Sequence, residues 1–412
     1  MGNSAGTYVF ALAGKADADN IIPVIWETSR DGQRCDVVIT DREVFAAQRT
    51  AWWVRERPSV RIIARLANGG APSFVERLRR LVWNRAALRR FLRSRDTRLV
   101  AVQWREGIAH DSASFLRRGI RWWSTDYFVQ LQLAAADLGI PTVALPHGHS
   151  TKTTVIRSSH VQAMSSEHDD KLPFADRDSF AAYVFCSDYH RDAILQSSTM
   201  SGGNVRVWGS PRFNDAWVPR LYAQSPSANL PSRPMSAKRR VLFFLPKWQN
   251  LIDRSATMQL ISALGGDERI QTVVRGHLRA EATTLEPAER DVLERGNLVI
   301  VTDDVPSPSL IAACDVVVDV DSSIAFDAVL LGKPYVRPKY LQDASVTTIW
   351  DQLGGAHQTD SLDETIALLT ADTLAPAPRD RAFDDVVFGG SGATVLARYR
   401  DGLREIALQR RV

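Results

Sequence analysis

The sequence lacks both of the glycine-rich phosphate loops that nucleotide-binding proteins often carry. Its 24 glycines form neither a G-x-G-x-x-G pattern nor a Walker A motif. This excludes the dinucleotide fingerprint and the P-loop as the means of holding a phosphate. Any phosphate site must be built from other backbone amides and side chains.

Cysteine is scarce. Cys35, Cys186 and Cys314 are odd in number and far apart in the chain. They show neither zinc-ligand spacing nor a disulfide framework, so we expect a reducing compartment. All three lie beside or inside apolar strand-like runs, which favours buried and inert thiols.

Long hydrophobic runs and strong net charge are also missing. No apolar run is long enough to cross a bilayer, and no basic region precedes the short apolar run near the start, which reads as a strand and not as a signal peptide. Gly6 stands where a myristoylation signal has Ser or Thr. The net charge is only +4, and no aromatic–basic platform or base-reading helix is visible, so we expect no nucleic-acid partner.

What the sequence contains is an alternation of strand and helix patterns. Its 412 residues, 45% of them apolar and 24% charged, are typical of a soluble globular protein with two domains. The alternation indicates parallel sheets with right-handed crossovers. We predict strands at residues 8–13, 35–40, 60–66, 99–104, 141–145, 181–186 and 205–208, and then at 241–245, 272–274, 298–302, 316–320 and 335–336. The main helices are expected at 20–29, 73–93, 126–138, 255–264, 287–295, 309–313 and 393–408.

A change of composition separates the two halves. Residues 223–239 are rich in Pro, Ser and Ala without periodicity, which is typical of a linker. We therefore predict an N-terminal domain at 1–222, a C-terminal domain at 240–388 and a closing segment at 389–412. Ligands of doubly wound sheets bind at the carboxyl ends of the strands, so motifs at strand ends are the candidates for chemistry.

The most informative of these motifs follows the strand predicted at 316–320. Asp321, Ser322 and Ser323 form a small polar turn before an apolar, helix-like run. Serine hydroxyls can cap a helix, and free backbone amides at a helix N-terminus attract an anion. The turn therefore predicts a seat for a diphosphate, although the same residues are also good capping chemistry without a ligand.

A second motif follows the strand at 141–145. His147, Gly148 and His149 stand at its carboxyl end, where Gly148 would allow close backbone approach or positive φ. A histidine here can take a proton from an acceptor hydroxyl. The alternatives are a surface-loop histidine beside a turn glycine, and a metal pair of the two histidines for which no third ligand suggests itself.

Three further strand ends carry polar residues. Arg275, His277 and Arg279 form a cationic loop that suits a phosphate-bearing donor, with a solvated loop as the alternative. The Gly209–Asn214 segment offers Ser210 and Arg212 to the same region, or is simply the turn before the linker. Lys247 and Trp248 follow the first strand of the second half, where the lysine could approach donor phosphates.

A basic helix is predicted in the first half, from Arg77 to Arg95. Leucines fall near one stripe of it and arginines crowd the rest. It fits an anionic membrane surface or a lipid-linked acceptor, and it fits equally a surface helix of an α/β layer with a solvated basic face.

Together these motifs resemble the GT-B glycosyltransferases, most of all the branch with CDP-glycerol glycerophosphotransferases and bacterial capsule or teichoic-acid transferases. The matching segments span most of the chain in the expected order: Pro146-His147-Gly148, Gly209–Phe213, Arg275-Gly276-His277, Asp315–Ser323 and Gly332-Lys333-Pro334. One residue departs from the pattern, since the family's second histidine is usually followed by proline and here by Leu278.

The resemblance implies a fold, a set of roles and a chemistry. The fold is α/β, with two Rossmann-like doubly wound domains facing a central cleft and the terminal helix packing back on the first. His147 would be the general base on the acceptor, and His277 would assist the leaving phosphate. Donor binding would fall to Arg275, Asp321, Ser322, Ser323, Lys247, Gly148 and Arg279, and acceptor binding to His149, Ser210 and Arg212. Members of this fold generally need no metal, so no cofactor is expected beyond the nucleotide-activated substrate.

The function expected from these residues is transfer of a glycosyl or polyol-phosphate group. The donor would be CMP-, CDP- or UDP-linked, and the acceptor a hydroxyl of a bacterial cell-surface glycan or lipid-linked intermediate. Two alternatives share the fold: a nucleotide-sugar 2-epimerase, and a non-catalytic nucleotide-sugar-binding protein. The expected location is the cytoplasm, with peripheral attachment at the inner face of the cell membrane through the basic helix as an option.

Overall fold

The chain folds into two compact α/β units. The computed structural model describes residues 6–40, 57–64, 85–105, 126–146, 148–153, 170–276, 286, 289, 291, 293, 297–301 and 305–409. Unit 1 comprises Met1–His149, Met164–Arg212 and Phe388–Val412, and unit 2 comprises Ser150–Ala163 and Phe213–Val387. The short stretch that follows His149 therefore belongs to unit 2, although its neighbours on both sides in the chain belong to unit 1.

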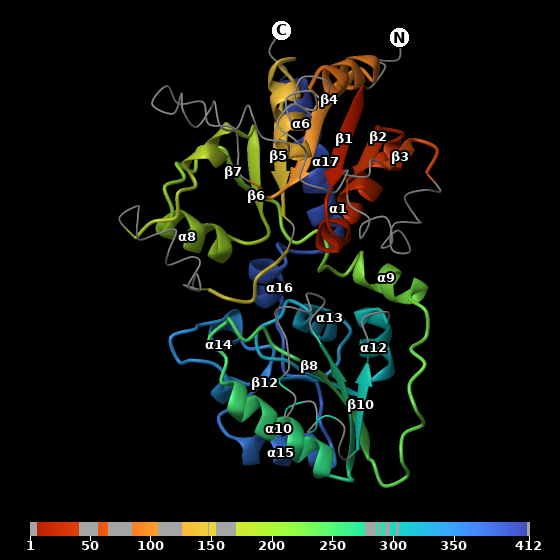
Figure 1. The fold of residues 1–412 in the computed structure, drawn as a ribbon, viewed down its shortest axis with the longest axis vertical. Helices are drawn as coiled ribbons and strands as arrows, with labels where there is room; N and C mark the ends of the chain where they lie inside the picture. Colours follow the sequence, from red (N-terminus) through yellow and green to blue (C-terminus); the bar gives the residue numbers. More distant parts are fainter. Residues whose placement is uncertain are drawn as a thin grey trace. The chain divides into compact units, whose positions relative to one another are not determined.

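Unit 1 is built on a sheet of seven parallel strands in the order β3-β2-β1-β4-β5-β6-β7 (Figure 1). The strands are β1 (Thr7–Leu12), β2 (Arg34–Ile39), β3 (Val60–Ala64), β4 (Thr97–Gln103), β5 (Thr142–Leu145), β6 (Ala182–Phe185) and β7 (Val205–Val207). The described helices are α1 (Lys15–Thr28), α6 (Tyr127–Ala136), α8 (Asp188–Ser197), α17 (Gly392–Leu408) and residues 85–94. The strand order reverses between β1 and β4, which makes this a doubly wound sheet.

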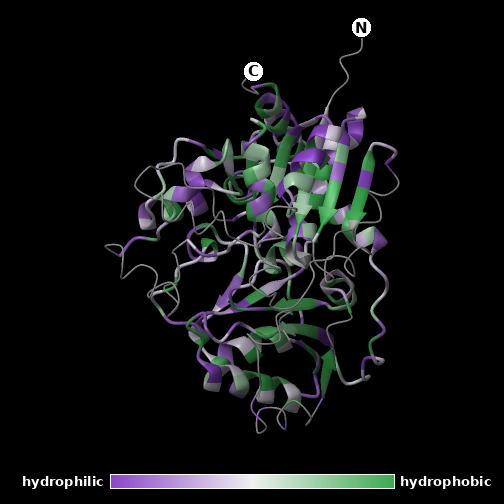
Figure 2. Ribbon diagram, turned by 45° about the horizontal axis from the view of Figure 1, so that its top comes forward, coloured by the Kyte–Doolittle hydropathy of each residue, from purple (hydrophilic) through white to green (hydrophobic). Residues whose placement is uncertain are grey.

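The core of unit 1 follows from the alternation of side chains along its strands. Val9, Val38 and Val102 point to the face where Leu92 and Leu131 pack. Both faces of β1 are buried along its whole length, as expected of a parallel sheet between two helix layers. Figure 2 shows these strands as predominantly hydrophobic.

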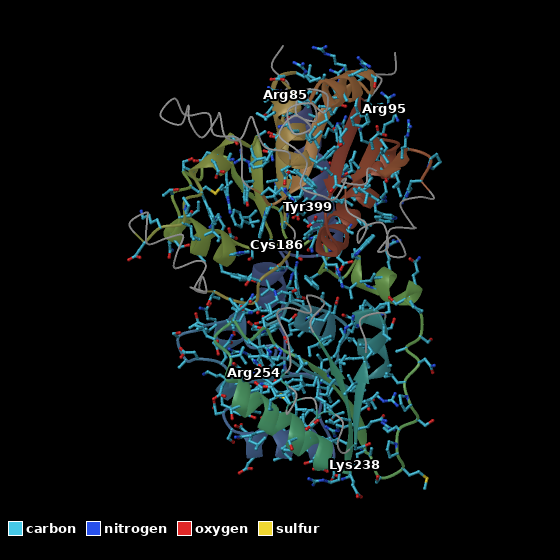
Figure 3. The ribbon with its side chains drawn as sticks, in the orientation of Figure 1. Arg85, Arg95, Cys186, Lys238, Arg254 and Tyr399 are labelled. Atoms are coloured by element: carbon cyan, nitrogen blue, oxygen red, sulfur yellow. The ribbon has the colours of Figure 1, made fainter. Side chains whose placement is uncertain are left out.

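The terminal helix α17 completes unit 1. It packs against α1 and β4, and the Tyr399 hydroxyl donates to the Gly209 carbonyl at 2.9 Å (Figure 3). The segment before α17 is held by the Ser210 amide, which donates to the Phe388 carbonyl at 2.9 Å. Gly402 lies so close to Trp208 that a Cβ there would come within 2.4 Å of the indole ring. The helix is thus an integral layer of unit 1.

The basic helix contributes to the same core over its described part. Leu88 and Leu92 are fully buried, and Arg85 pairs with Asp137 at 2.6 Å. Arg95 pairs with Asp36 at 2.8 Å; both arginines are labelled in Figure 3. These contacts support the reading as a packed layer helix, and attachment to a membrane stays a prediction. Residues 77–84 lie outside the described part of the chain.

Unit 2 is built on a sheet of six parallel strands in the order β10-β9-β8-β11-β12-β13 (Figure 1). The strands are β8 (Arg239–Phe244), β9 (Ile270–Arg275), β10 (Leu298–Val301), β11 (Val316–Val318), β12 (Tyr335–Pro338) and β13 (His357–Thr359). The described helices are α9 (Val218–Gln224), α10 (Arg254–Gly266), α12 (Ser307–Ala313), α13 (Ala325–Leu330), α14 (Ile349–Leu353), α15 (Leu362–Thr370) and α16 (Arg381–Val387). Here the order reverses between β8 and β11. One face packs Val241 and Val318 against Ile261 of α10 and Leu369 of α15.

The predicted fold class is confirmed, since both halves are doubly wound parallel α/β units and α17 packs in the first. The predicted strands all appear within the described residues, but β13 was not predicted. The three cysteines are free and buried, as expected. The compact units divide the chain at Arg212 and Phe213, ahead of the linker predicted at 223–239, because α9 packs against α12 of unit 2. Among the described residues, no helix is long and apolar enough to cross a membrane.

Candidate functional site

The reversal of strand order in unit 2 brings together two loops that the sequence marks separately. The loop after β8 contains Lys247, and the turn after β11 contains Asp321, Ser322 and Ser323. Connections leave the sheet in opposite directions at such a switch point and open a crevice beyond the strands' carboxyl ends. The two loops are in direct contact, because the Asn250 side-chain amide donates to Asp321 Oδ2 at 2.7 Å.

The turn itself is organised by Asp319. Its Oδ2 accepts from the Ser322 amide at 2.7 Å, and the Ser322 hydroxyl accepts from the Ile324 amide at 3.3 Å. Helix α13 begins only at Ala325, with Ile324 as its N-cap and no side-chain cap. The expectation that the two serines cap the helix is therefore wrong, because the turn continues past them and Asp319 already occupies one amide. Ser322 and Ser323 remain partly exposed on the turn.

Asp319 is fully buried and electrostatically unusual. Its side chain has no solvent exposure, and its Oδ1 has no hydrogen-bond partner among the described residues. Burial, reinforced by the charge of Asp321, raises the pKa of Asp319 to about 7. A carboxyl group that changes protonation near neutral pH thus lies directly behind the turn.

Asp321 forms an ion pair on the turn. Lys152 Nζ lies 2.6 Å from Asp321 Oδ2, and the two side chains are 15% and 3% exposed. The Thr151 hydroxyl donates to the Asp321 carbonyl at 3.2 Å. Sequence reasoning placed Asp321 near the donor but missed Lys152, whose position after β5 gave no sign of a contact with unit 2.

A buried arginine binds the backbone at the start of the turn. Arg337 on β12 is 1% exposed, and its Nε donates to the Val320 carbonyl at 3.2 Å. Its other nitrogens reach Asp351 at 3.0 Å, Gln358 at 2.6 Å and Gln342 at 3.0 Å. The Tyr335 hydroxyl donates to the Asp319 carbonyl at 3.2 Å. Four acceptors around one guanidinium fix the backbone of the turn, a task for which its forked donors are suited.

Only the first part of the cationic loop predicted after β9 lies among the residues that the structure describes. Arg275 is 2% exposed, and its guanidinium donates to the Val305 carbonyl. In this arrangement it anchors the chain beyond β10 rather than offering its charge to solvent. His277 and Arg279 lie outside the described residues, as does His147 of unit 1.

The remaining predicted residues cluster in the interior of unit 1. His149 is 2% exposed, and its Nε2 lies 2.9 Å from the Tyr189 hydroxyl. Burial, together with the charge of His190, lowers the pKa of His149 well below its ordinary value. Ser210 and Arg212 are also buried. All three side chains are buried in unit 1, and their contact with an acceptor stays a prediction.

Gly148 does not have the positive φ that the sequence allowed for it. Its φ lies outside the left-handed region, and a Cβ at this position would meet nothing within 4 Å. Its carbonyl accepts from the Cys186 thiol at 3.7 Å. Close approach of a ligand to the Gly148 backbone stays a prediction.

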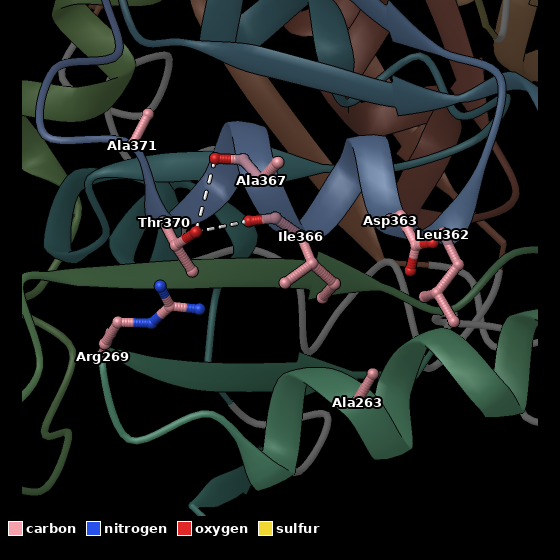
Figure 4. Close-up of a pocket in the computed structure, with 8 residues that line it drawn as sticks. All are labelled: Ala263, Arg269, Leu362, Asp363, Ile366, Ala367, Thr370 and Ala371. Atoms are coloured by element: carbon pink, nitrogen blue, oxygen red, sulfur yellow. Dashed lines mark hydrogen bonds between the residues drawn. The ribbon is translucent and has the colours of Figure 1, made fainter.

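Unit 2 also has a hollow between α10 and α15, lined by residues that include Ala263, Arg269 and Ile366 (Figure 4). None of the polar strand-end residues lines it, so it is not part of the candidate site. Among the described residues, no group of three or more His, Cys, Asp or Glu side chains could hold a metal ion.

Two doubly wound units of this topology, with the last helix packed in the first unit, define the GT-B fold. Solved structures share it over nearly the whole chain. A UDP-GlcNAc 2-epimerase from Neisseria meningitidis bound to UDP-GlcNAc has a TM-score of 0.54 at 13% identity, with 98% of this chain and 100% of that chain covered. Another from Methanocaldococcus jannaschii, in complex with UDP-GlcNAc and UDP, has a TM-score of 0.52 at 11% identity and covers 97% and 99%.

A third similar structure is Anabaena Alr3699/HepE in complex with UDP and glucose. Its TM-score is 0.51 at 14% identity, and the match covers 98% of both chains. No protein-family model matches the sequence, and no curated protein matches it. At such low identity the likenesses establish the fold, and activity has to be argued from the site.

Proposed function

We propose that this protein transfers a glycosyl or polyol-phosphate group from a nucleotide-activated donor to a hydroxyl of a cell-surface glycan or lipid-linked acceptor. The observation that carries the proposal is the contact of the Lys247 loop with the Asp319–Ser323 turn at the switch point of unit 2. In doubly wound sheets this is where nucleotides bind. The complexes with UDP among the similar structures favour a uridine nucleotide as the first donor to test.

The proposed donor site uses amides and cations in place of a glycine-rich loop. Ser323, with the hydroxyl of Ser322, would contact the phosphates on the exposed side of the turn, and Lys247 would face them from the β8 loop. Asp321 would orient the site. His277 and Arg279 at the neighbouring strand end would add positive charge directly, and Arg275 would act on the donor only through its field from a buried position. Charge seated in this way stabilises a leaving phosphate without reorganisation during the reaction.

The proposed chemistry is a single displacement on the donor. His147 would take the proton of the acceptor hydroxyl as its oxygen attacks the transferred group. The bond to the leaving phosphate breaks, and the nucleotide departs with the electron pair, assisted by His277. His149, Ser210 and Arg212 are proposed to shape the acceptor side through the segments that they hold in place. Neither a metal nor another cofactor enters this scheme.

The first test replaces His147. His147→Ala should lower turnover by about a hundredfold, the scale expected for losing a positioned general base. His357→Ala is the matched control, because His357 of β13 bonds the Ala375 carbonyl through Nε2 and has no proposed role. Steady-state rates for donor consumption with acceptor provide the measurement. A folded His147→Ala enzyme with near-normal turnover refutes the assignment of the base.

A 2-epimerase is the second candidate, favoured by two of the three similar structures. Asp17, near the carboxyl end of β1, is a candidate for acid–base chemistry at carbon, but its carboxylate caps α1 by accepting from the Ala13 and Gly14 amides at 2.8 and 2.9 Å. Incubation with UDP-GlcNAc in deuterated water, without acceptor, separates the reactions. Deuterium at C2 supports epimerisation, and donor use that requires an acceptor supports transfer.

A further inference from the structure

The segment between β5 and residue 153 is anchored in each unit separately. On the unit 1 side, the Gly148 carbonyl accepts a hydrogen bond from the Cys186 thiol, and the His149 ring forms a hydrogen bond with the Tyr189 hydroxyl. On the unit 2 side, the Thr153 amide donates to the Thr347 carbonyl at 3.0 Å, and the Ile349 amide donates to the Thr151 carbonyl at 2.9 Å. Residues 151–153, here called the strap, are therefore a fixed part of unit 2.

The strap carries one cation, Lys152, into the polar turn after β11. Removing an ammonium and a carboxylate from water costs several kcal/mol per ion, and a single close contact between them seldom recovers it. The Lys152–Asp321 pair bears this cost on two connecting segments, outside the strands of the sheet. This arrangement is expected if the Lys152 ammonium also binds another anion.

The groups around the Lys152–Asp321 pair support the same interpretation. Two carboxyl groups, Asp319 and Asp321, lie on the turn, and one oxygen of Asp319 lacks a partner among the described residues. Asp321 already accepts from Asn250 at 2.7 Å as well as from Lys152. If Lys152 turned to another anion, the Asp321 carboxylate would keep the Asn250 amide as a hydrogen-bond donor.

We propose that Lys152 is a phosphate ligand of the nucleotide site, with Asp321 as the counter-ion that holds it in place while the site is empty. The inference rests on the proposed function and names a residue of the same site. The ligand class is a nucleoside diphosphate or its ester, bound through the phosphate nearest to the turn. Asp321 then acts as a competitor for Lys152 and sets the affinity for phosphate.

The experiment compares UDP with uridine by isothermal titration calorimetry. Lys152→Met should weaken UDP binding by about tenfold or more, the scale of one charge-assisted phosphate contact, and should leave uridine binding unchanged. Lys152→Arg should recover part of the loss. Asp321→Asn should tighten UDP binding, because the competing carboxylate is gone. Lys238→Met is the matched control, since Lys238 pairs with exposed Asp372 elsewhere in unit 2 at 2.5 Å.

A merely structural lysine gives a different pattern. Lys152→Met would then lower the melting temperature while the ratio of UDP to uridine affinity stays at the wild-type value, and that result overturns the inference. If Lys152→Met does not fold, the double variant Lys152→Met, Asp321→Asn leaves no unpaired charge and is compared with Asp321→Asn alone. An unchanged ratio between these two also overturns it. Wild-type protein that binds neither UDP nor CDP refutes the proposed function itself.

Discussion

At the scale of single residues, the most unusual group is the buried carboxyl of Asp319. Its pKa is raised from 3.8 to about 7 by burial, with Asp321 adding to the shift. Because the folded-state pKa lies above the unfolded one, the native protein binds more protons between pH 4 and pH 7. Stability should therefore fall as pH rises through this window and level off above it.

Asp319→Asn tests this linkage, because the amide keeps the size of the side chain and cannot ionise. The stability of the variant relative to wild type should be about 3 kcal/mol higher at pH 8 than at pH 5, because the buried carboxyl of the wild type loses its proton between these two pH values and the amide does not. Chemical denaturation at both pH values measures the change, and an identical difference at pH 5 and pH 8 contradicts the assignment.

Arg337 offers a second test at this scale, because the chain contains a matched exposed pair. Arg337–Asp351 and Arg233–Asp315 both have 3.0 Å contacts, but the arginine side chains are 1% and 44% exposed. Arg337→Met should destabilise the fold by about 3–5 kcal/mol, since it strands buried acceptors. Arg233→Met should cost less than about 1 kcal/mol. Equal losses in urea denaturation would mean that burial of the pair is not what matters.

At the scale of elements, the alternation of patterns was enough to predict the strands but not all that lies between them. β13 (His357–Thr359) is short and has no apolar run, so its pairing with β12 comes from tertiary contact. Helix α15 carries a start signal in its sequence but was not among the predicted helices. Ser361 caps the Glu364 amide at 3.2 Å, and the Glu364 side chain accepts from the Asp360 amide at 2.7 Å, which is nearly a capping box.

The loop after β7 and the segment before α17 approach each other closely at Gly209 and Gly389. Gly389 has φ +82°, and a Cβ there would lie 2.6 Å from the Gly209 Cα, so Gly389→Ala meets both strain and a backbone clash. Gly32 is the matched control, since it has φ +78° with open space around it. Gly32→Ala should cost about 1 kcal/mol from φ alone, and Gly389→Ala clearly more. Similar melting temperatures for the two variants would mean that the close approach is not required.

At the scale of the whole molecule, the sequence marked the loops of the candidate site but not the residues that contact them. The polar ends of β8 and β11 were predicted because strand ends are where doubly wound folds bind ligands. Lys152 and Asn250 were missed because each reaches the turn from a distant part of the chain, and Arg337 because no local pattern shows that its side chain bonds the Val320 carbonyl. Thr151 and Asp321, for example, are 170 positions apart. Such contacts depend on strand order and on which unit a connecting segment joins, neither of which a local pattern contains.

The division into units makes the place of nucleotide binding a testable property. UDP at a hundred times its dissociation constant should add about 2.7 kcal/mol to the stability of whatever folds around it. Hydrogen exchange should then slow at the end of β8, at the Asp319–Ser323 turn and at the strap, because ligand binding suppresses the local openings that expose these amides. The amides of β1–β3 in unit 1 serve as the internal control. Protection confined to that edge of unit 1 would place the nucleotide in the wrong unit for the proposed donor site, and the roles given to Ser322, Ser323 and Lys152 would fall together.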